Sequence, residues 1–304
     1  MIKRNFMDLA PIILFVYNRP KHTKETLEAL KKNVFADQSV LYIFSDAAKN
    51  DKDFTSVQTV RDYIKTANGF KEILITEREK NLGLANSIIS GVTEIIKTYG
   101  RAIVLEDDIV TSVHFLKFMN EALEFYKHDK RIYSISGYNF PIKIPASYQH
   151  QVYLSPRPSS WGWATWKDRW ENAEWKPESI FDIKNKKAVR NLMDKAGKDL
   201  APMLLKSIEG KISSWAVKWA FTHLKKDSYC LYPTRSLIKN IGADASGTNF
   251  NKVTSRYEVE LDDSIKDFIF SKKLVYSEEL NDQIKKIVRP GLLSFLKYRL
   301  FNIY

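Results

Sequence analysis

Residues 102–109 read Ala-Ile-Val-Leu-Glu-Asp-Asp-Ile, an apolar run that ends directly in three acids. A continuous apolar run is typical of a strand buried on both faces of a sheet. Further apolar runs stand at residues 11–17, 40–44, 73–75 and 132–136. Segments with helical patterning lie between them, at residues 20–33, 54–67, 83–99 and 114–126. This alternation predicts an α/β fold, with a mostly parallel sheet covered by helices on both faces.

The chain has 304 residues, which suffices for one large domain or two modest ones. Near residue 138 the composition changes, because prolines and tryptophans become frequent. No linker sequence separates the residues before this point from those after it. We therefore expect two halves of one domain, residues 1–138 and 139–260. A helical, basic C-terminal tail is expected over residues 261–304.

Composition narrows the class of protein. The formal net charge of +12 leaves nucleic acid, an anionic membrane and anionic small molecules open as partners. A single cysteine, Cys230, excludes an intrachain disulfide and a multi-cysteine metal site. No apolar stretch approaches the roughly 20 residues of a membrane span, and the N-terminal residues lack the apolar core of a signal peptide. We expect a cytoplasmic protein.

Polar residues follow each of the first four predicted strands. They are Arg19, Asp46, the pair Asn81 and Gly83, and the triplet Glu106-Asp107-Asp108. Because the carboxyl ends of parallel strands meet at one edge of the sheet, where α/β folds bind ligands, we expect a polar-ligand site there. Taken singly, each has an ordinary alternative role as a turn residue, a loop charge or a helix start.

The acidic triplet is the most informative of these elements. Three adjacent acids after a buried strand repel one another and are costly to desolvate together. A magnesium or manganese ion, held by one or two carboxylates and by substrate phosphates, would relieve that repulsion. The alternative is a solvated acidic loop that starts the next helix.

Several motifs in order resemble one known family. They are residues 11–20 (PIILFVYNRP), 44–46 (FSD), 81–83 (NLG), 105–109 (LEDDI), 136–139 (SGYN), 160–166 (SWGWATW) and 239–242 (KNIG). Over about residues 10–250 the chain resembles nucleotide-sugar glycosyltransferases of the GT-A fold, which is Rossmann-like. It is most similar to the inverting N-acetylglucosaminyltransferase I type and to bacterial enzymes that build surface polysaccharides.

The resemblance implies roles for individual residues. Asp108 corresponds to the ligand of a Mn²⁺ or Mg²⁺ ion on the donor diphosphate, and Asp107 and Glu106 correspond to contacts with the donor ribose or sugar. Asp46 corresponds to the residue that reads the base, usually uracil, and Arg19 to a nucleotide contact. Further donor or acceptor contacts are implied at Asn81, Gly83, Trp161, Gly162 and Trp163. Trp163, Trp166 and Trp170 also fit helical spacing, so the alternative for the tryptophans is a core stripe.

The implied activity is transfer of a sugar from a UDP-sugar to a saccharide or lipid-linked saccharide acceptor, with inversion, in surface polysaccharide synthesis. The family's catalytic aspartate would stand at Ala216, and a later metal-binding histidine would stand at Asn249. We therefore expect Asp244, the nearest carboxylate in the right region, to accept the proton of the acceptor hydroxyl.

Two other classes remain open from the sequence. A sugar nucleotidyltransferase would also use a metal and a nucleotide, but Tyr17-Asn18-Arg19-Pro20 replaces a glycine-rich phosphate loop. A non-catalytic protein could bind carbohydrate through the tryptophans, or nucleic acid through the basic charge, although we expect no nucleic-acid partner. The basic and leucine-rich residues 285–301 suit an anionic membrane surface, a docked terminal helix or a homo-oligomer contact.

Overall fold

The computed structural model describes residues 8–176, 186–244 and 255–291. The strands are β1 (Ile12–Val16), β2 (Val40–Ser45), β3 (Glu72–Glu77), β4 (Arg101–Glu106), β5 (Ile109–Thr111), β6 (Ile132–Ser136), β7 (Val152–Ser155), β8 (Trp163–Trp166), β9 (Tyr229–Pro233) and β10 (Ile238–Asn240). The helices are α1 (Pro20–Leu30), α2 (Asp51–Ile64), α3 (Leu84–Tyr99), α4 (Phe115–Phe125), α5 (Lys167–Trp170), α7 (Lys186–Met193), α8 (Leu200–Ile208), α9 (Trp215–Lys225) and α10 (Glu278–Ile287). A short 3-10 helix spans Ala36–Gln38.

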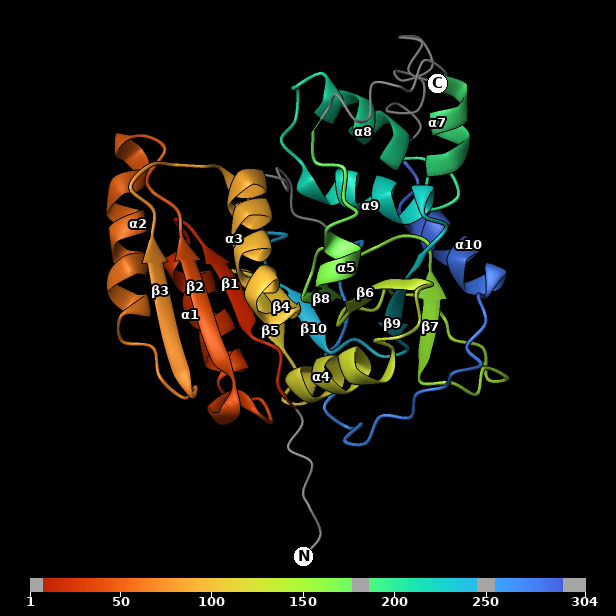
Figure 1. Ribbon diagram of the computed structural model, residues 1–304, viewed down its shortest axis with the longest axis horizontal. Helices are drawn as coiled ribbons and strands as arrows, with labels where there is room; N and C mark the ends of the chain where they lie inside the picture. The colour runs from red at the N-terminus through yellow and green to blue at the C-terminus, as the bar shows by residue number, and fades with distance from the viewer. Residues whose placement is uncertain (1–7, 177–185, 245–254, 292–304) are drawn as a thin grey trace, which may run out of the picture.

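One eight-stranded sheet runs through the molecule in the order β3-β2-β1-β4-β8-β6-β9-β7 (Figure 1). Strands β3, β2, β1 and β4 are parallel, as the sequence predicts. Strand β8 then runs antiparallel between β4 and β6, and β7 runs antiparallel to β9. The α/β class is therefore confirmed, with a sheet that is parallel in its first four strands and mixed beyond them.

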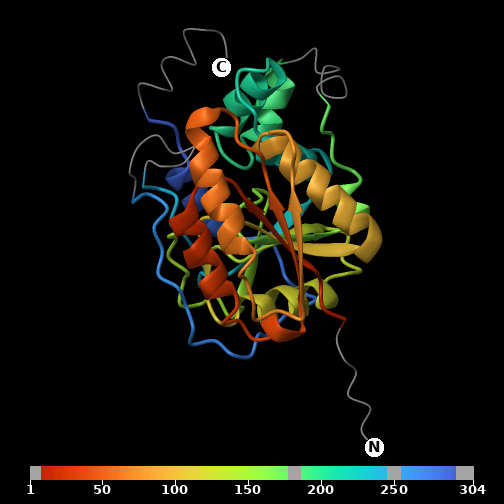
Figure 2. The same cartoon turned by 90° about the vertical axis from the view of Figure 1, so that its left-hand side faces the viewer.

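Side chains of β1 alternate between the two faces of the sheet. Ile12, Leu14 and Val16 join the core beneath α1, α2 and α4, whereas Ile13 and Phe15 join the core beneath α3. Figure 2 shows α1 and α2 on one side of the strands and α3 on the other. Because both faces are buried, the strand needs an unbroken apolar run, which is the pattern that predicted it.

The tryptophans of the second half form core rather than a helical stripe. Trp163 is fully buried and stacks on Trp215 and Trp170, with ring centroids 5.0 and 5.5 Å apart. Trp219 extends this stack behind α3. Helical spacing was misleading for Trp163 and Trp166, because both lie in strand β8, whose residues are buried on both faces.

Beyond residue 260 the chain crosses the molecule without a regular element until α10 begins at Glu278. Helix α10 is docked, because Leu280, Ile284 and Val288 are buried in the main core. Residues 292–304, on which the expected membrane contact mainly depends, lie outside the described residues. Within the described ranges, no helix combines the length and the apolar character that a membrane crossing requires.

Candidate active site

Strand β4 carries the acidic triplet to the edge of the sheet, with Glu106 beside Phe15 of β1. Asp107 and Asp108 are buried directly after it. Burial, together with the negative charges of Asp108 and Asp107, raises the pKa of Glu106 to about 8, although the charge of Arg19 opposes them. Burial also raises the pKa of Asp107, against the opposing charge of Arg19. Glu106 therefore favours its protonated form at neutral pH.

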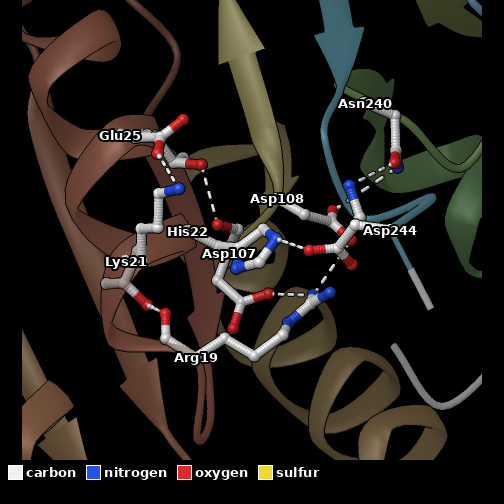
Figure 3. A network of polar contacts seen from close by, with 11 residues as sticks. Arg19, Lys21, His22, Glu25, Asp107, Asp108, Asn240 and Asp244 are labelled. Carbon is white, nitrogen blue, oxygen red and sulfur yellow. Dashed lines mark hydrogen bonds and ion pairs between the residues drawn. The ribbon is translucent and has the colours of Figure 1, made fainter. Parts of the chain in front are cut away.

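Arg19, at the end of β1, binds both aspartates through one nitrogen. Its Nη2 donates to Asp107 Oδ1 and, at 2.9 Å, to Asp108 Oδ2 (Figure 3). The two negative charges raise the pKa of Arg19 although burial opposes them. The sequence predicts that a divalent cation offsets the repulsion between the acidic side chains. In this structure the guanidinium group of Arg19 offsets it instead.

A second segment closes over the pair from the other half of the chain. Strand β10 pairs antiparallel with β5, which places Asn240 opposite Ile109 and brings the following residues above the aspartates. Ile241 N donates to Asp108 O at 2.9 Å. A Cβ at Gly242 would lie 2.1 Å from Asp108 Oδ2 and 3.0 Å from Arg19 Nη1, so only glycine permits this approach.

Asp244 lies beside this cluster, as the sequence interpretation requires of a base. Its Oδ2 is 3.2 Å from Nε2 of His22, and its side chain is 48% exposed whereas that of His22 is 12% exposed (Figure 3). His22 was missed by sequence reasoning. Its position in the first turn of α1, three residues after Arg19, is the sequence feature that could have indicated a place in the site. Asn249, in the position of the family's histidine, lies outside the described residues.

A hydrogen-bonded turn joins the ends of β2 and β3, and it contains Asp46, Asn81 and Gly83. The Asp46 carboxylate accepts hydrogen bonds from the backbone N–H groups of Leu82 and Gly83, and Asn81 Nδ2 donates to Ala47 O at 2.7 Å. Gly83 has a φ of 72° and stands at the N-terminus of α3. Asp46 thus holds the loop in place, and its role toward a base stays a prediction.

Arg78 is a second residue that the sequence interpretation did not select. It follows β3 directly, and its backbone N–H donates to Ser45 O at 2.9 Å. Its guanidinium lies 5.0 Å from the centre of the Phe44 ring. Within the described part of the chain, its buried Nε and Nη2 have no hydrogen-bond partner. Buried donors are normally satisfied, so these two atoms suit an acceptor on a ligand.

The segment 161–163 divides between surface and core. Trp161 is half-buried, with its ring 4.8 Å from Tyr138 and 5.7 Å from Tyr257. Gly162 adopts a φ of 53° and accepts a hydrogen bond from Gly137 N. Trp163 is fully buried, so in this structure its ring is part of the core and is not exposed to a ligand. Ala216 lies in the first turn of α9 and packs against the tryptophan stack.

The residues present fit a divalent cation that is shared with a diphosphate. Asp107 and Asp108 direct carboxylate oxygens toward one positive group, and such hard oxygen donors suit Mg²⁺ and Mn²⁺. Across the described ranges, three or more His, Cys, Asp or Glu side chains nowhere converge as a metal cluster. Substrate phosphates commonly complete the coordination of such ions, so two carboxylates suffice.

Comparison with known proteins gives only remote similarities. No protein-family model matches the chain, and no curated protein matches it in sequence. The solved structure of S. aureus TarS matches with 11% identity and a TM-score of 0.44, over 75% of this chain and 36% of TarS. The mannosyltransferase PcManGT from Pyrobaculum calidifontis, solved with GDP-Man and Mn²⁺, matches with 15% identity and a TM-score of 0.37.

The second match covers 54% of this chain and 49% of PcManGT. The chain therefore spans about a third to a half of the proteins it is similar to. PcManGT is a mannosyltransferase by its name.

Proposed function

We propose that the protein is a metal-dependent glycosyltransferase that moves a sugar from a UDP-sugar to a saccharide or lipid-linked saccharide. One observation carries the proposal. Two buried carboxylates at the carboxyl end of β4 converge with the guanidinium of Arg19 from β1 and are covered by Gly242. This is the edge of the sheet at which α/β folds bind ligands.

Each part of the donor has a suitable partner at this edge. Asp108, with Asp107 beside it, would hold a Mn²⁺ or Mg²⁺ ion together with the diphosphate. The buried and unsatisfied donors of Arg78 suit a carbonyl oxygen of the base or a ribose oxygen. Asp46 fixes the turn at residues 81–83, which follows Arg78 in the chain. Trp161 offers an aromatic face to a sugar ring.

The chemistry follows from where the charges lie. When bound, the cation neutralises the negative charge that grows on the departing diphosphate. Arg19 adds a positive charge at the same place. Asp244, held by His22, accepts the proton of the acceptor hydroxyl as that oxygen attacks the anomeric carbon. Attack from the face opposite the diphosphate inverts the configuration of the sugar.

The binding half of the proposal is tested by calorimetry with UDP and Mn²⁺. We expect the wild type to bind UDP only with the metal, and Asp108→Asn to lose that binding while its circular dichroism spectrum is unchanged. Asp37→Asn is the matched control, because Asp37 is exposed in the short 3-10 helix Ala36–Gln38. Metal-dependent binding that survives in Asp108→Asn would refute the assignment of the metal ligand.

The catalytic half is tested by turnover. A panel of nucleotide sugars is incubated with the protein, Mn²⁺ and simple saccharide acceptors, and release of the nucleoside diphosphate is measured. We expect UDP to be released from at least one UDP-sugar. Formation of a nucleotide sugar from a sugar phosphate and a nucleoside triphosphate would instead identify a nucleotidyltransferase.

A further inference from the structure

Arg19 lies where a cation between two carboxylates would lie. A single nitrogen, Nη2, donates to both Asp107 Oδ1 and Asp108 Oδ2. All three side chains are largely buried, with exposed fractions of 16%, 6% and 13%. The arginine therefore neutralises the aspartates in a place that solvent barely reaches.

Arg19 and a divalent ion would compete for the same pair of carboxylates. Two positive groups on one pair of buried carboxylates would repel each other strongly, because the low dielectric of the site weakens screening. Gly242 also restricts the space for an ion, because its backbone lies close to both Asp108 Oδ2 and Arg19 Nη1. An ion that retains water ligands therefore needs both a displaced arginine and more room beneath residues 240–242.

We propose that Arg19 is an internal cation that occupies the aspartate pair until the diphosphate of the donor draws it away, so that nucleotide and divalent ion bind cooperatively. This inference rests on the proposed function for the identity of the nucleotide. It adds an order to the binding events, in which metal alone binds weakly and metal with nucleotide binds tightly.

Local structure fixes the backbone of Arg19, so that exchange of its partners would involve the side chain alone. The carbonyl of Arg19 accepts hydrogen bonds from both the backbone N–H and the Oγ1 of Thr23, at 3.0 and 2.9 Å. Pro20 follows at the first position of α1, where its fixed φ favours the helix. The guanidinium fork suits phosphate oxygens at least as well as carboxylates, so a diphosphate is a competent competitor for it.

The test is a titration of free Mn²⁺ by electron paramagnetic resonance, with and without UDP. Coupling between two ligands is typically about 5- to 150-fold in affinity, and we expect UDP to tighten Mn²⁺ binding to the wild type within that range. Arg19→Gln removes the internal cation, so it should bind Mn²⁺ alone at least about tenfold more tightly than the wild type, a change within the same range. The coupling to UDP should shrink accordingly.

Arg131→Gln is the matched control, because it removes the same charge from a half-exposed arginine that pairs with Asp129 elsewhere. It should bind Mn²⁺ as the wild type does. The thermal unfolding midpoint of each variant, with and without Mn²⁺, shows that the protein is folded and reports metal binding independently. The midpoint of Arg19→Gln should rise more with Mn²⁺ than that of the wild type.

Two results would overturn the inference. One is a folded Arg19→Gln that binds Mn²⁺ alone no more tightly than the wild type. The other is a wild type that binds UDP and yet has the same Mn²⁺ affinity with and without it, which is decisive even where Arg19→Gln does not fold. Absence of turnover with every nucleotide sugar would contradict the proposed function instead, and it would leave the Mn²⁺ comparison of wild type and variant intact.

Discussion

Asp244 and His22 form a carboxylate–imidazole pair beside the acidic cluster, with 3.2 Å between Oδ2 and Nε2. The sequence selects Asp244 only because Ala216 leaves the family's usual base position without a carboxylate. The structure adds a partner that restricts where the carboxylate points. A proton acceptor needs such restriction, since general-base help depends on hydrogen-bond reach to the attacking hydroxyl.

Asp244→Asn should reduce turnover by about 100-fold or more, because general-base catalysis contributes about 10²–10⁴ in rate. The affinity for UDP and Mn²⁺ should stay nearly unchanged, since the role is in the chemical step. Asp267→Asn, at a side chain that is 98% exposed, is the control for loss of a carboxylate. Near-normal turnover in Asp244→Asn would exclude this residue. Higher activity in Ala216→Asp would show that the usual base position is simply vacant.

His223 makes the stability of the protein sensitive to acid. It is fully buried, its Nε2 lies 3.2 Å from Ser134 Oγ, and burial lowers its pKa from 6.5 to about 3. The unfolded chain takes up a proton near pH 6.5 whereas the folded protein does not. The free energy of unfolding therefore falls as the pH drops from 6.5 toward 3.

The size of this effect is measurable by urea unfolding. Between about pH 7.5 and about pH 5.5 the wild type should lose about 1.4 kcal/mol through this group. His223→Gln should lose less over the same interval, because it has no imidazole to protonate. His128→Gln, at an exposed histidine, should keep the pH dependence of the wild type. The assignment is wrong if His223→Gln and the wild type show the same dependence.

At the scale of elements, two short strands decide the shape of the site. Strands β5 and β10 have three residues each, and their pairing brings residues 240–242 from the second half over the acids of the first. Strands this short give no periodicity that a sequence pattern can detect. The sequence shows the motif at residues 239–242, but it does not show that this motif lies above Asp108.

Helix α10 belongs to the core although it lies near the C-terminal end. Leu280, Ile284 and Val288 are buried, and burying such side chains contributes about 1.5–3 kcal/mol each. A chain that ends at Tyr276 should therefore lose roughly 5–9 kcal/mol, which is comparable to the whole stability of many domains. A chain that ends at Gly291 keeps α10 and should unfold at a higher temperature than the chain that ends at Tyr276. Equal unfolding midpoints for the two shortened chains would contradict the docking of α10.

At the scale of the whole molecule, both halves of the chain contribute strands to one continuous sheet. Strands β1 to β4 supply the parallel part, and β8 and β6 extend it without a break. The insertion of β8 beside β4 also places the tryptophan stack directly behind α3. Residues of the first and second halves of the chain are therefore fixed relative to each other, as the proposed reaction between two substrates requires.

The residue pattern alone predicts the α/β class, the parallel strands with their helices, and the edge at which Arg19, Asp46 and the acidic triplet lie. It could do so because buried strands need apolar runs and because parallel strands end at a common edge. The residue pattern does not predict that Arg19 bridges both aspartates, that Gly242 covers them, or that His22 contacts Asp244. These contacts join residues that are up to about 220 positions apart in the chain, so their geometry depends on packing and not on any local pattern.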